Sequence, residues 1–170
     1  MDSEGFKRKL TAVLSADVVG YSRLMRDDEE FTVRNLNTYK EMIFDLVDRN
    51  RGRLVDSTGD NLLAEFASVV DAVRCAVQIQ EDLKSKNEEL PDNRKMEFRI
   101  GINTGDVIQE GDRIYGDGVN VAARLEALAD VGGICISRTV YDQIKRKLNL
   151  KYEYLGEYKV KNIDEPSYLP

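Results

Sequence analysis

The feature that most constrains the fold of this chain is the order in which its hydrophobic patterns change. Apolar runs and strict alternation predict strands, whereas apolar residues spaced three to four apart predict amphipathic helices. These patterns give a strand, a helix, a hairpin, a second helix and a further strand, over residues 10–19, 27–50, 53–66, 69–90 and 98–104. That order is typical of the split βαβ arrangement, so we predict an α+β fold with a ferredoxin-like βαββαβ core.

The remaining patterns extend this core without a linker. They predict a strand or hairpin, a helix, a strand, a helix and an aromatic-rich strand, over residues 107–115, 118–129, 134–137, 138–148 and 152–160. A chain of 170 residues with 42% hydrophobic residues has the length and the apolar surface of one domain. We predict a flexible lead-in over residues 1–9 and one domain over residues 10–170, with helices packed on a sheet that is rich in antiparallel pairs.

Composition excludes several classes of function. The chain has no histidine, which removes Ser-His-Asp and Cys-His catalysis, histidine general bases and the common zinc sites. Any chemistry therefore depends on carboxylates, cations, amides and bound metal. The 31 acidic and 25 basic side chains give a formal charge of −6, which argues against a nucleic-acid partner and against an anionic membrane surface.

The apolar runs and the two cysteines indicate where such a chain works. No run is long enough to cross a bilayer, and the polar N-terminus lacks the apolar stretch of a signal peptide. Cys75 lies in a helical pattern and Cys135 in a strand pattern, so we interpret both as buried thiols. We therefore expect a cytoplasmic domain without membrane contact, to which a regulatory domain can be attached in the full-length protein.

Two aspartates form the first candidate site. Asp17 ends the first predicted strand, and Asp60 lies in the turn of the following hairpin, so neighbouring strands would bring them together. Two carboxylates placed in this way repel each other unless a hard cation such as Mg²⁺ or Mn²⁺ lies between them. In the alternative, structural interpretation, Asp17 caps the following turn and Asp60 is an ordinary turn residue.

Asn120 and Arg124 form the second candidate site. They are four residues apart in a predicted helix, so their side chains project from one face. An amide beside a guanidinium suits the oxygens of a substrate, and the guanidinium can stabilise charge that develops during phosphoryl transfer. The alternative is that Asn120 begins the helix and Arg124 is a solvated charge.

Four segments that include these residues resemble the class III adenylate and guanylate cyclases. Residues 14–22 (LSADVVGYS) and 56–66 (DSTGDNLLAEF) are similar to the two metal-binding segments of that family. Residues 99–105 (RIGINTG) resemble its central strand, and residues 115–124 (YGDGVNVAAR) resemble its catalytic helix. The segments occur in the family's order and at its spacing, and the resemblance runs from about Arg8 to the end. It implies the nucleotide cyclase fold.

The resemblance also implies an activity and its cofactors. The expected reaction converts ATP to 3′,5′-cyclic AMP and pyrophosphate, in signal transduction, by two-metal-ion catalysis at the interface of a homodimer. Asp17, Asp60 and the carbonyl of Val18 would hold two Mg²⁺ or Mn²⁺ ions per active site on the triphosphate. No side-chain base is then required, which agrees with the absence of histidine.

The same resemblance assigns roles to residues of the second subunit. Asn120 would orient the ribose, and Arg124 would neutralise the phosphate in the transition state. Lys161 matches the family's triphosphate-binding lysine, although Asn162 stands where a glycine usually follows it. Because the aspartates and these residues would come from different subunits, a monomer is expected to be nearly inactive.

The sequence departs from the best-known adenylate cyclases at the two positions that read the base. Asp56 stands in place of a lysine and Arg113 in place of an aspartate. The exchanged pair still offers one acceptor and one donor, so either adenine or guanine can be bound. Alternatively, the two side chains form a salt bridge with each other. The predicted substrate is ATP; the alternatives are a guanylate cyclase that uses GTP and a catalytically silent module that binds nucleotide and dimerises.

Overall fold

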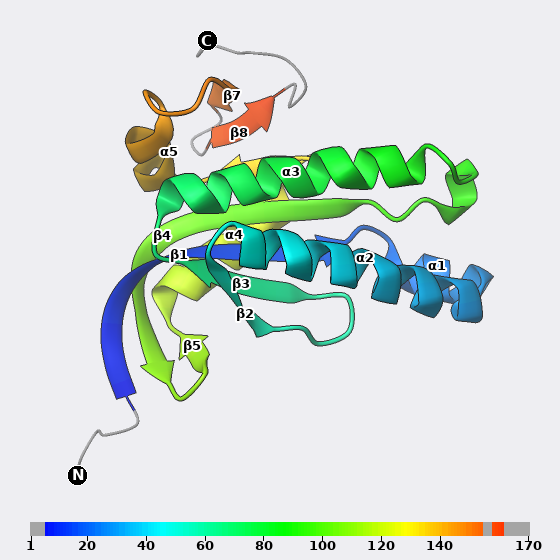
Figure 1. Cartoon of the computed structure of the whole chain (residues 1–170), viewed down its shortest axis with the longest axis horizontal. Coiled ribbons are helices and arrows are strands. Elements are labelled where there is room, and N and C mark those ends of the chain that lie inside the picture. Colours follow the sequence, from blue (N-terminus) through cyan, green and yellow to red (C-terminus); the bar gives the residue numbers. More distant parts are fainter. Residues whose placement is uncertain (1–5, 155–157, 162–170) are drawn as a thin grey trace.

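The computed structural model describes residues 6–154 and 158–161 of the chain. They form an eight-stranded sheet in the order β2, β3, β1, β4, β6, β8, β7, with β5 paired to β4 (Figure 1). The strands are β1 Phe6–Val18, β2 Gly52–Asp56, β3 Leu62–Phe66, β4 Phe98–Glu110, β5 Arg113–Tyr115, β6 Ile134–Ile136, β7 Lys151–Tyr154 and β8 Tyr158–Lys161. The helices are α1 Tyr21–Asp27, α2 Glu29–Arg49, α3 Val69–Asn87, α4 Asp117–Leu128, α5 Arg138–Ile144 and the single 3₁₀ turn η1 Asp92–Arg94.

Residues 6–110 form the predicted βαββαβ core. In chain order the core runs β1, α2, β2, β3, α3, β4, and its strands lie in the order β2, β3, β1, β4 with antiparallel pairs throughout. The α+β class, the ferredoxin-like core and the antiparallel-rich sheet are therefore confirmed. The C-terminal additions join the sheet through β6, which pairs parallel to β4.

Helices cover both faces of the sheet because β1 is buried on both sides. Alternate residues such as Ala12, Leu14 and Ala16 belong to the main core, which α2 and α3 complete. Val13 faces the other way and packs with Ala122 of α4. Figure 1 shows α2 and α3 in front of the sheet, whereas α4 lies behind it. The side chain of Asp17 is on the α4 side, since side chains alternate along a strand.

Helix caps explain where the two long helices begin. The Asp28 side chain accepts a hydrogen bond from the Phe31 N–H at 3.0 Å, and the Ser68 side chain accepts one from the Asp71 N–H at 3.2 Å. Both caps satisfy first-turn amides that have no partner inside their helix.

Several elements differ from the prediction. β1 begins at Phe6, four residues before the expected start, because residues 6–9 pair with residues 107–110 of β4. β4 runs unbroken to Glu110, since β1 pairs with it along its whole length. The aromatic-rich segment forms two strands, β7 and β8, instead of one, and α5 ends at Ile144 rather than at residue 148. The short helix α1 was not predicted.

The two cysteines are free and buried, as expected. Burial raises the pKa of Cys75 to about 12, so its thiol is protonated at neutral pH. None of the helices in the described ranges combines the length and the hydropathy that a membrane span requires.

Candidate active site

Asp17 and Asp60 meet at the C-terminal end of β1. The backbone N–H of Val18 donates a hydrogen bond of 3.3 Å to Oδ2 of Asp60. This bond holds the turn between β2 and β3 against the residue that follows Asp17. Both aspartates are partly exposed, so ions and substrate can reach them. The predicted meeting of the two carboxylate residues is therefore found.

The turn that carries Asp60 depends on a glycine. The Asn61 N–H donates to the Thr58 carbonyl at 3.0 Å and closes the turn, as expected for this segment. Gly59 has φ of +58°, a left-handed conformation that residues with a side chain rarely adopt. Gly59 thus lets the chain reverse within the turn and present Asp60 to β1.

Arg99 was not predicted as a site residue, but it lies beside Asp17. The two residues are cross-strand partners of β4 and β1, so their side chains share the α4 face of the sheet. The Nε atom of Arg99 is buried and has no hydrogen-bond partner in the described part of the chain. A buried donor without a partner is costly, and an anionic ligand at this position would satisfy it. The sequence does not show which residues of β1 and β4 lie opposite each other. Only the strand register of the folded structure places Arg99 beside Asp17.

Glu126 of α4 is a second residue that the sequence analysis missed. Its side chain is buried and accepts a hydrogen bond of 3.0 Å from the Ser15 hydroxyl. Burial, a hydrogen bond with the Asp17 carboxyl and the charge of Asp17 raise the pKa of Glu126 to about 8, and the charge of Asp60 adds to the effect. Three carboxyl groups therefore crowd this end of the sheet, which favours either protonation or a bound cation.

Glu126 gives a testable dependence of stability on pH. Because its folded-state pKa lies above its unfolded value, the folded protein binds more protons between about pH 4.5 and pH 8, and its free energy of unfolding falls as pH rises through that window. We expect Glu126→Gln to be more stable than the wild type by on the order of 1–3 kcal/mol near pH 8, with a smaller difference near pH 5.

Urea unfolding of both proteins in buffer with a chelator, at several pH values, measures this difference. The matched control is Glu110→Gln, which removes an exposed carboxylate from the same sheet and is expected to leave the pH dependence unchanged. A Glu126→Gln protein whose stability follows that of the wild type at every pH would contradict the buried, protonated state.

Close packing fixes α4 against β4. A side chain at Gly101 would place its Cβ within 2.3 Å of the Ala122 carbonyl and even closer to the Glu126 backbone nitrogen. The Asn103 side-chain amide donates to the Gly118 carbonyl at 3.2 Å, which anchors the first turn of the helix. The missing side chain at Gly101 thus allows α4 to lie directly on the sheet.

Asn120 and Arg124 lie on the exposed side of α4. The buried residues of this helix are Gly118, Ala122, Leu125 and Glu126, and they face the sheet. Asn120 and Arg124 are both exposed, four residues apart. Within one chain the structure therefore does not group them with Asp17 and Asp60. They are presented outward, where a second molecule could meet them.

Asp56 and Arg113 form the salt bridge that the sequence analysis raised as an alternative. The Arg113 Nη2 and Asp56 Oδ2 atoms are 3.7 Å apart, and the two side chains are 63% and 41% exposed. The Thr58 hydroxyl also donates to Asp56 at 2.9 Å. Nearby, the Arg53 guanidinium donates to the Asp112 carbonyl at 2.9 Å, which ties β2 to the turn before β5.

A β-bulge decides which way Asp56 points. Leu54 pairs with Ala64 and Asp56 pairs with Leu63, so Val55 has no partner in the register. The extra residue reverses the alternation of β2. Asp56 consequently shares the face of Leu63, towards α4 and β5, instead of following Leu54 towards the main core.

Lys161 ends β8, but its side chain falls outside the described residues. Asp17 and Asp60 have the hard oxygen ligands that Mg²⁺ and Mn²⁺ prefer, and the raised pKa of Glu126 reflects its burial first and the nearby carboxyl groups second. In the described part of the chain, no three Asp, Glu, Cys or His side chains are grouped as a complete metal site. The residues therefore fit divalent ions that take their remaining ligands from phosphate or water.

Comparison with other sequences gives the family context of this site. A family model described as the adenylate and guanylate cyclase catalytic domain matches residues 7–168. A Rhizobium meliloti protein, provisionally named adenylate cyclase 3, is 42% identical over 99% of this chain and 29% of its own length. An adenylate cyclase of Streptomyces coelicolor is 31% identical over 85% of this chain and 36% of its own length. The chain thus spans about a third of the length of these curated relatives.

Solved structures agree with the fold. The crystal structure of an adenylate/guanylate cyclase/hydrolase from Silicibacter pomeroyi matches with a TM-score of 0.84 at 40% identity, over 95% of this chain and 94% of that chain. The adenylyl cyclase CyaB from P. aeruginosa matches with a TM-score of 0.79 at 22% identity, over 92% and 96% of the two chains. The second match is a similarity of fold alone.

Proposed function

Because the chain belongs to the family of adenylate and guanylate cyclase catalytic domains, we propose that it converts ATP into 3′,5′-cyclic AMP and pyrophosphate as a homodimer. The observation that carries the proposal is the meeting of Asp17 and Asp60 at the end of β1, with Arg99 as the cross-strand partner of Asp17. Carboxylates that can hold divalent cations, next to a guanidinium that can bind phosphate, are the groups that a triphosphate site requires.

In the proposed site, Asp17, Asp60 and the carbonyl of Val18 would hold two Mg²⁺ or Mn²⁺ ions. When bound, these ions would supply the positive charge that lowers the pKa of the ribose 3′-hydroxyl and stabilises the departing pyrophosphate. The crowding of Glu126 against Asp17 supports a cation site, since neighbouring carboxylates are stabilised by a bound cation.

The side chains of the proposed site position the substrate and stabilise its negative charge. The Arg99 guanidinium donates to phosphate oxygens, the Asn120 amide orients the ribose, and Arg124 stabilises the negative charge that develops on the transferred phosphate. Lys161 is proposed to bind the triphosphate. None of these roles requires a histidine, and the chain has none.

We propose that each site is shared between two chains. Asn120 and Arg124 are exposed on the outer side of α4, whereas Glu126, on its inner side, lies beside Asp17 of its own chain. A helix cannot present both faces to the same carboxylates. A second copy that offers its exposed α4 face to Asp17 and Asp60 would complete two equivalent sites in a twofold dimer.

We propose that Asp56 and Arg113 contact the base. Their ion pair is accessible, so a base could accept a hydrogen bond from the guanidinium and donate one to the carboxylate. Both adenine and guanine offer such a pair of groups, which makes GTP the near alternative to ATP. The same ion pair also favours the second candidate function, a nucleotide-binding module without turnover, if the two side chains stay closed on each other.

The proposed activity is tested by incubating the purified dimer with ATP or GTP and Mn²⁺ and measuring cyclic nucleotide. The Asp17→Ala protein sets the background. Formation of cyclic AMP well above that background supports an adenylate cyclase, and cyclic GTP as the main product supports the guanylate alternative. If neither product exceeds the background while the protein remains dimeric, the chain is not an active cyclase.

The assignment of the base contacts predicts a change of specificity. Exchanging Asp56 for Lys together with Arg113 for Asp is expected to raise the ratio of ATP to GTP turnover by about tenfold, because it restores the lysine and the aspartate that the best-known adenylate cyclases have at these two positions. The kcat/KM values for both nucleotides measure the ratio. The matched control reverses the exposed ion pair of α2, as Asp45→Arg with Arg49→Asp, and should leave the ratio unchanged. An unchanged ratio in the Asp56 and Arg113 variant would count against base reading by this pair.

We propose that the reaction takes place in the cytoplasm. Free buried thiols such as Cys75 and Cys135 are typical of reducing compartments, where nucleoside triphosphates are also available.

A further inference from the structure

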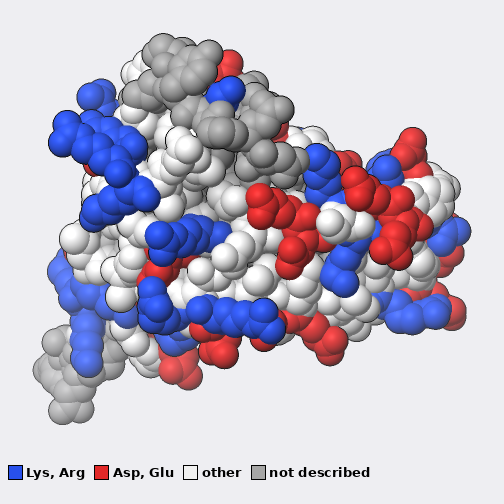
Figure 2. All heavy atoms as spheres, turned by 45° about the horizontal axis from the view of Figure 1, so that its top comes forward, with Lys and Arg blue, Asp and Glu red and all other residues white. Residues whose placement is uncertain are grey.

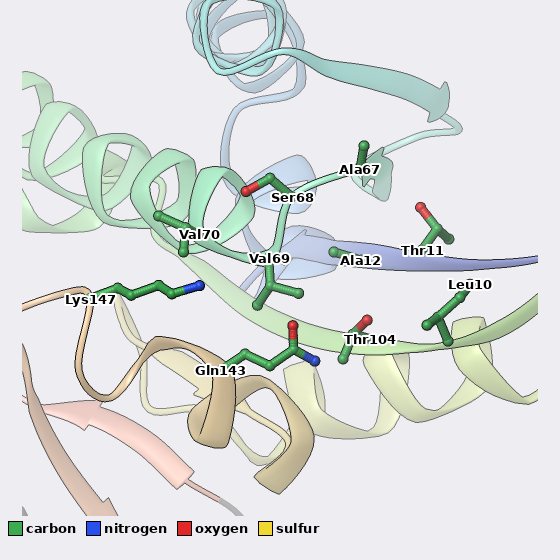
Figure 3. A pocket seen from close by; sticks show the side chains of 10 residues that line it. All are labelled: Leu10, Thr11, Ala12, Ala67, Ser68, Val69, Val70, Thr104, Gln143 and Lys147. Carbon is green, nitrogen blue, oxygen red and sulfur yellow. The ribbon is translucent and has the colours of Figure 1, made fainter.

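A small pocket lies between the start of α3 and α5, away from the candidate active site (Figure 3). Its volume is about 250 Å³, below the 300–1,000 Å³ that drug-sized ligands usually occupy. Ala12, in its lining, is five residues from Asp17, or about 16 Å along β1, and its side chain faces the opposite side of the sheet. The pocket is therefore independent of the proposed cyclase site.

The charges around this pocket are positive. Val69 and Val70 line it and belong to the first turn of α3, a helix of 19 residues whose N-terminus carries partial positive charge. No hydrogen bond to either N–H occurs among the described residues. Asp71, also in this turn, does not cancel the charge, because the Arg51 guanidinium binds it through two hydrogen bonds of 2.8 and 3.1 Å.

Lys147 adds a full charge to the pocket. In Figure 3 its side chain extends from the segment after α5 towards the first turn of α3. Figure 2 shows lysine and arginine side chains gathered on the side of the molecule where α5 lies. The exposed cations of this segment are Arg138, Lys145, Arg146 and Lys147. No carboxylate is among the residues that line the pocket.

Thr104 is a second feature of the pocket that points to a ligand, independently of the N-terminus of α3. It lies on β4, at the floor of the pocket, and only 9% of its surface is exposed. Its hydroxyl makes no hydrogen bond within the described ranges and is not sealed from solvent, so it is available to a ligand in the pocket. Gln143 of α5 also points its amide into this space (Figure 3). A hydroxyl donor without a protein partner in the described ranges therefore faces the same cavity as a helix N-terminus and an ammonium group.

We propose that this pocket binds a small oxyanion, with inorganic phosphate as the representative ligand. The oxygens of such an ion would accept hydrogen bonds from the first-turn N–H groups of α3, the Thr104 hydroxyl and the Gln143 amide, while Lys147 balances its charge. The bound ion links α3 to α5 and so joins the βαββαβ core to the C-terminal additions.

The test is a titration of the isotope-labelled protein with inorganic phosphate, followed by amide chemical shifts. A chelator keeps divalent ions out of the active site, and chloride keeps the ionic strength constant. We expect saturable shifts at Val69, Val70, Thr104 and Gln143. Sulfate is expected to bind in the same way, whereas chloride alone should leave these residues unchanged.

Variants identify the groups that hold the ion. Lys147→Gln is expected to weaken phosphate binding about tenfold, because a charge-assisted contact is lost. Thr104→Val should weaken it about threefold, and Thr104→Ser, which keeps the hydroxyl, should restore it. The matched control is Arg146→Gln, which removes a neighbouring exposed charge that does not line the pocket. Its affinity is expected to stay within about twofold of the wild type.

Three results would overturn the proposal. The first is the absence of saturable shifts in the pocket residues. The second is an equal loss of affinity in Lys147→Gln and Arg146→Gln, which would indicate a diffuse effect of surface charge. The third is a Thr104→Val protein that folds and binds phosphate as tightly as the wild type. None of these measurements uses cyclase turnover. Failure of the phosphate proposal therefore leaves the proposed cyclase function intact, and failure of the cyclase function leaves the phosphate proposal intact.

Discussion

Asp60→Ala and Arg124→Ala proteins are each expected to keep less than about 1% of wild-type cyclase activity, yet their mixture should recover a large part of it. In the proposed dimer, Asp60 of one chain and Arg124 of the other serve the same site. A heterodimer of the two variants therefore holds one intact site and one that carries both defects. If subunits exchange freely, an equimolar mixture should reach about a quarter of the wild-type activity.

The control for this experiment is a mixture of Asp17→Ala and Asp60→Ala proteins. Both substitutions lie on the aspartate side of the site, so every heterodimer lacks one metal ligand in each site. We expect no recovery, although subunit exchange is the same. Exchange is verified by pull-down of an untagged variant with a tagged one. Absence of recovery in the first mixture, or equal recovery in both mixtures, would rule out the proposed sharing of the site.

Gly101→Ala is expected to have the second largest effect, through the position of α4. The added methyl group would overlap the backbone of Ala122 and Glu126, which cannot move aside as a flexible side chain could. We expect a loss of about 3 kcal/mol in the free energy of unfolding, equivalent to a fall of roughly 6–12 °C in the melting temperature of a chain of this size.

The same substitution should reduce turnover more than stability alone explains. Displacing α4 by even about 1 Å moves Asn120 and Arg124 together, and misplacement on that scale can cost about 100-fold in rate. Calorimetry and kcat measurements well below the melting temperature separate the two effects. A Gly101→Ala protein with normal kcat would show that the helix position is not important for the reaction.

Gly111→Ala is the matched control for this glycine. Gly111 lies in the turn between β4 and β5, with φ of +61° and no atom within 4 Å of the position that a Cβ would take. The only expected cost in stability is that of placing a residue with a side chain in the left-handed conformation, about 1 kcal/mol. The loss of stability should therefore be about a third of that expected at Gly101.

Hydrophobic periodicity was sufficient to predict the core of the fold. The alternation of strands and helices predicts the βαββαβ order, and the caps at Asp28 and Ser68 lie where acidic and hydroxyl residues precede the helical patterns. Periodicity could not predict that β4 continues to Glu110. That continuation depends on pairing with β1, a contact between segments about a hundred residues apart.

The site was predicted only in part, for a similar physical reason. Asp17 and Asp60 could be recognised from their motifs and from the hairpin. Glu126 and Arg99 could not, because their importance comes from strand register and from the close approach of α4. Glu126 is buried, and so is the Nε atom of Arg99, which is unusual for charged groups, and burial is a property of the folded structure.

The irregularity at Val55 has a consequence for the edge of the sheet. If Val55 were deleted, Asp56 would follow Leu54 directly and still pair with Leu63, so its carboxylate would stay on the side of α4 and Arg113. β2 is an edge strand, and a strand interrupted by a bulge is a poor template for pairing with another chain. A single deletion there would thus keep the proposed base contact while straightening an edge that invites aggregation.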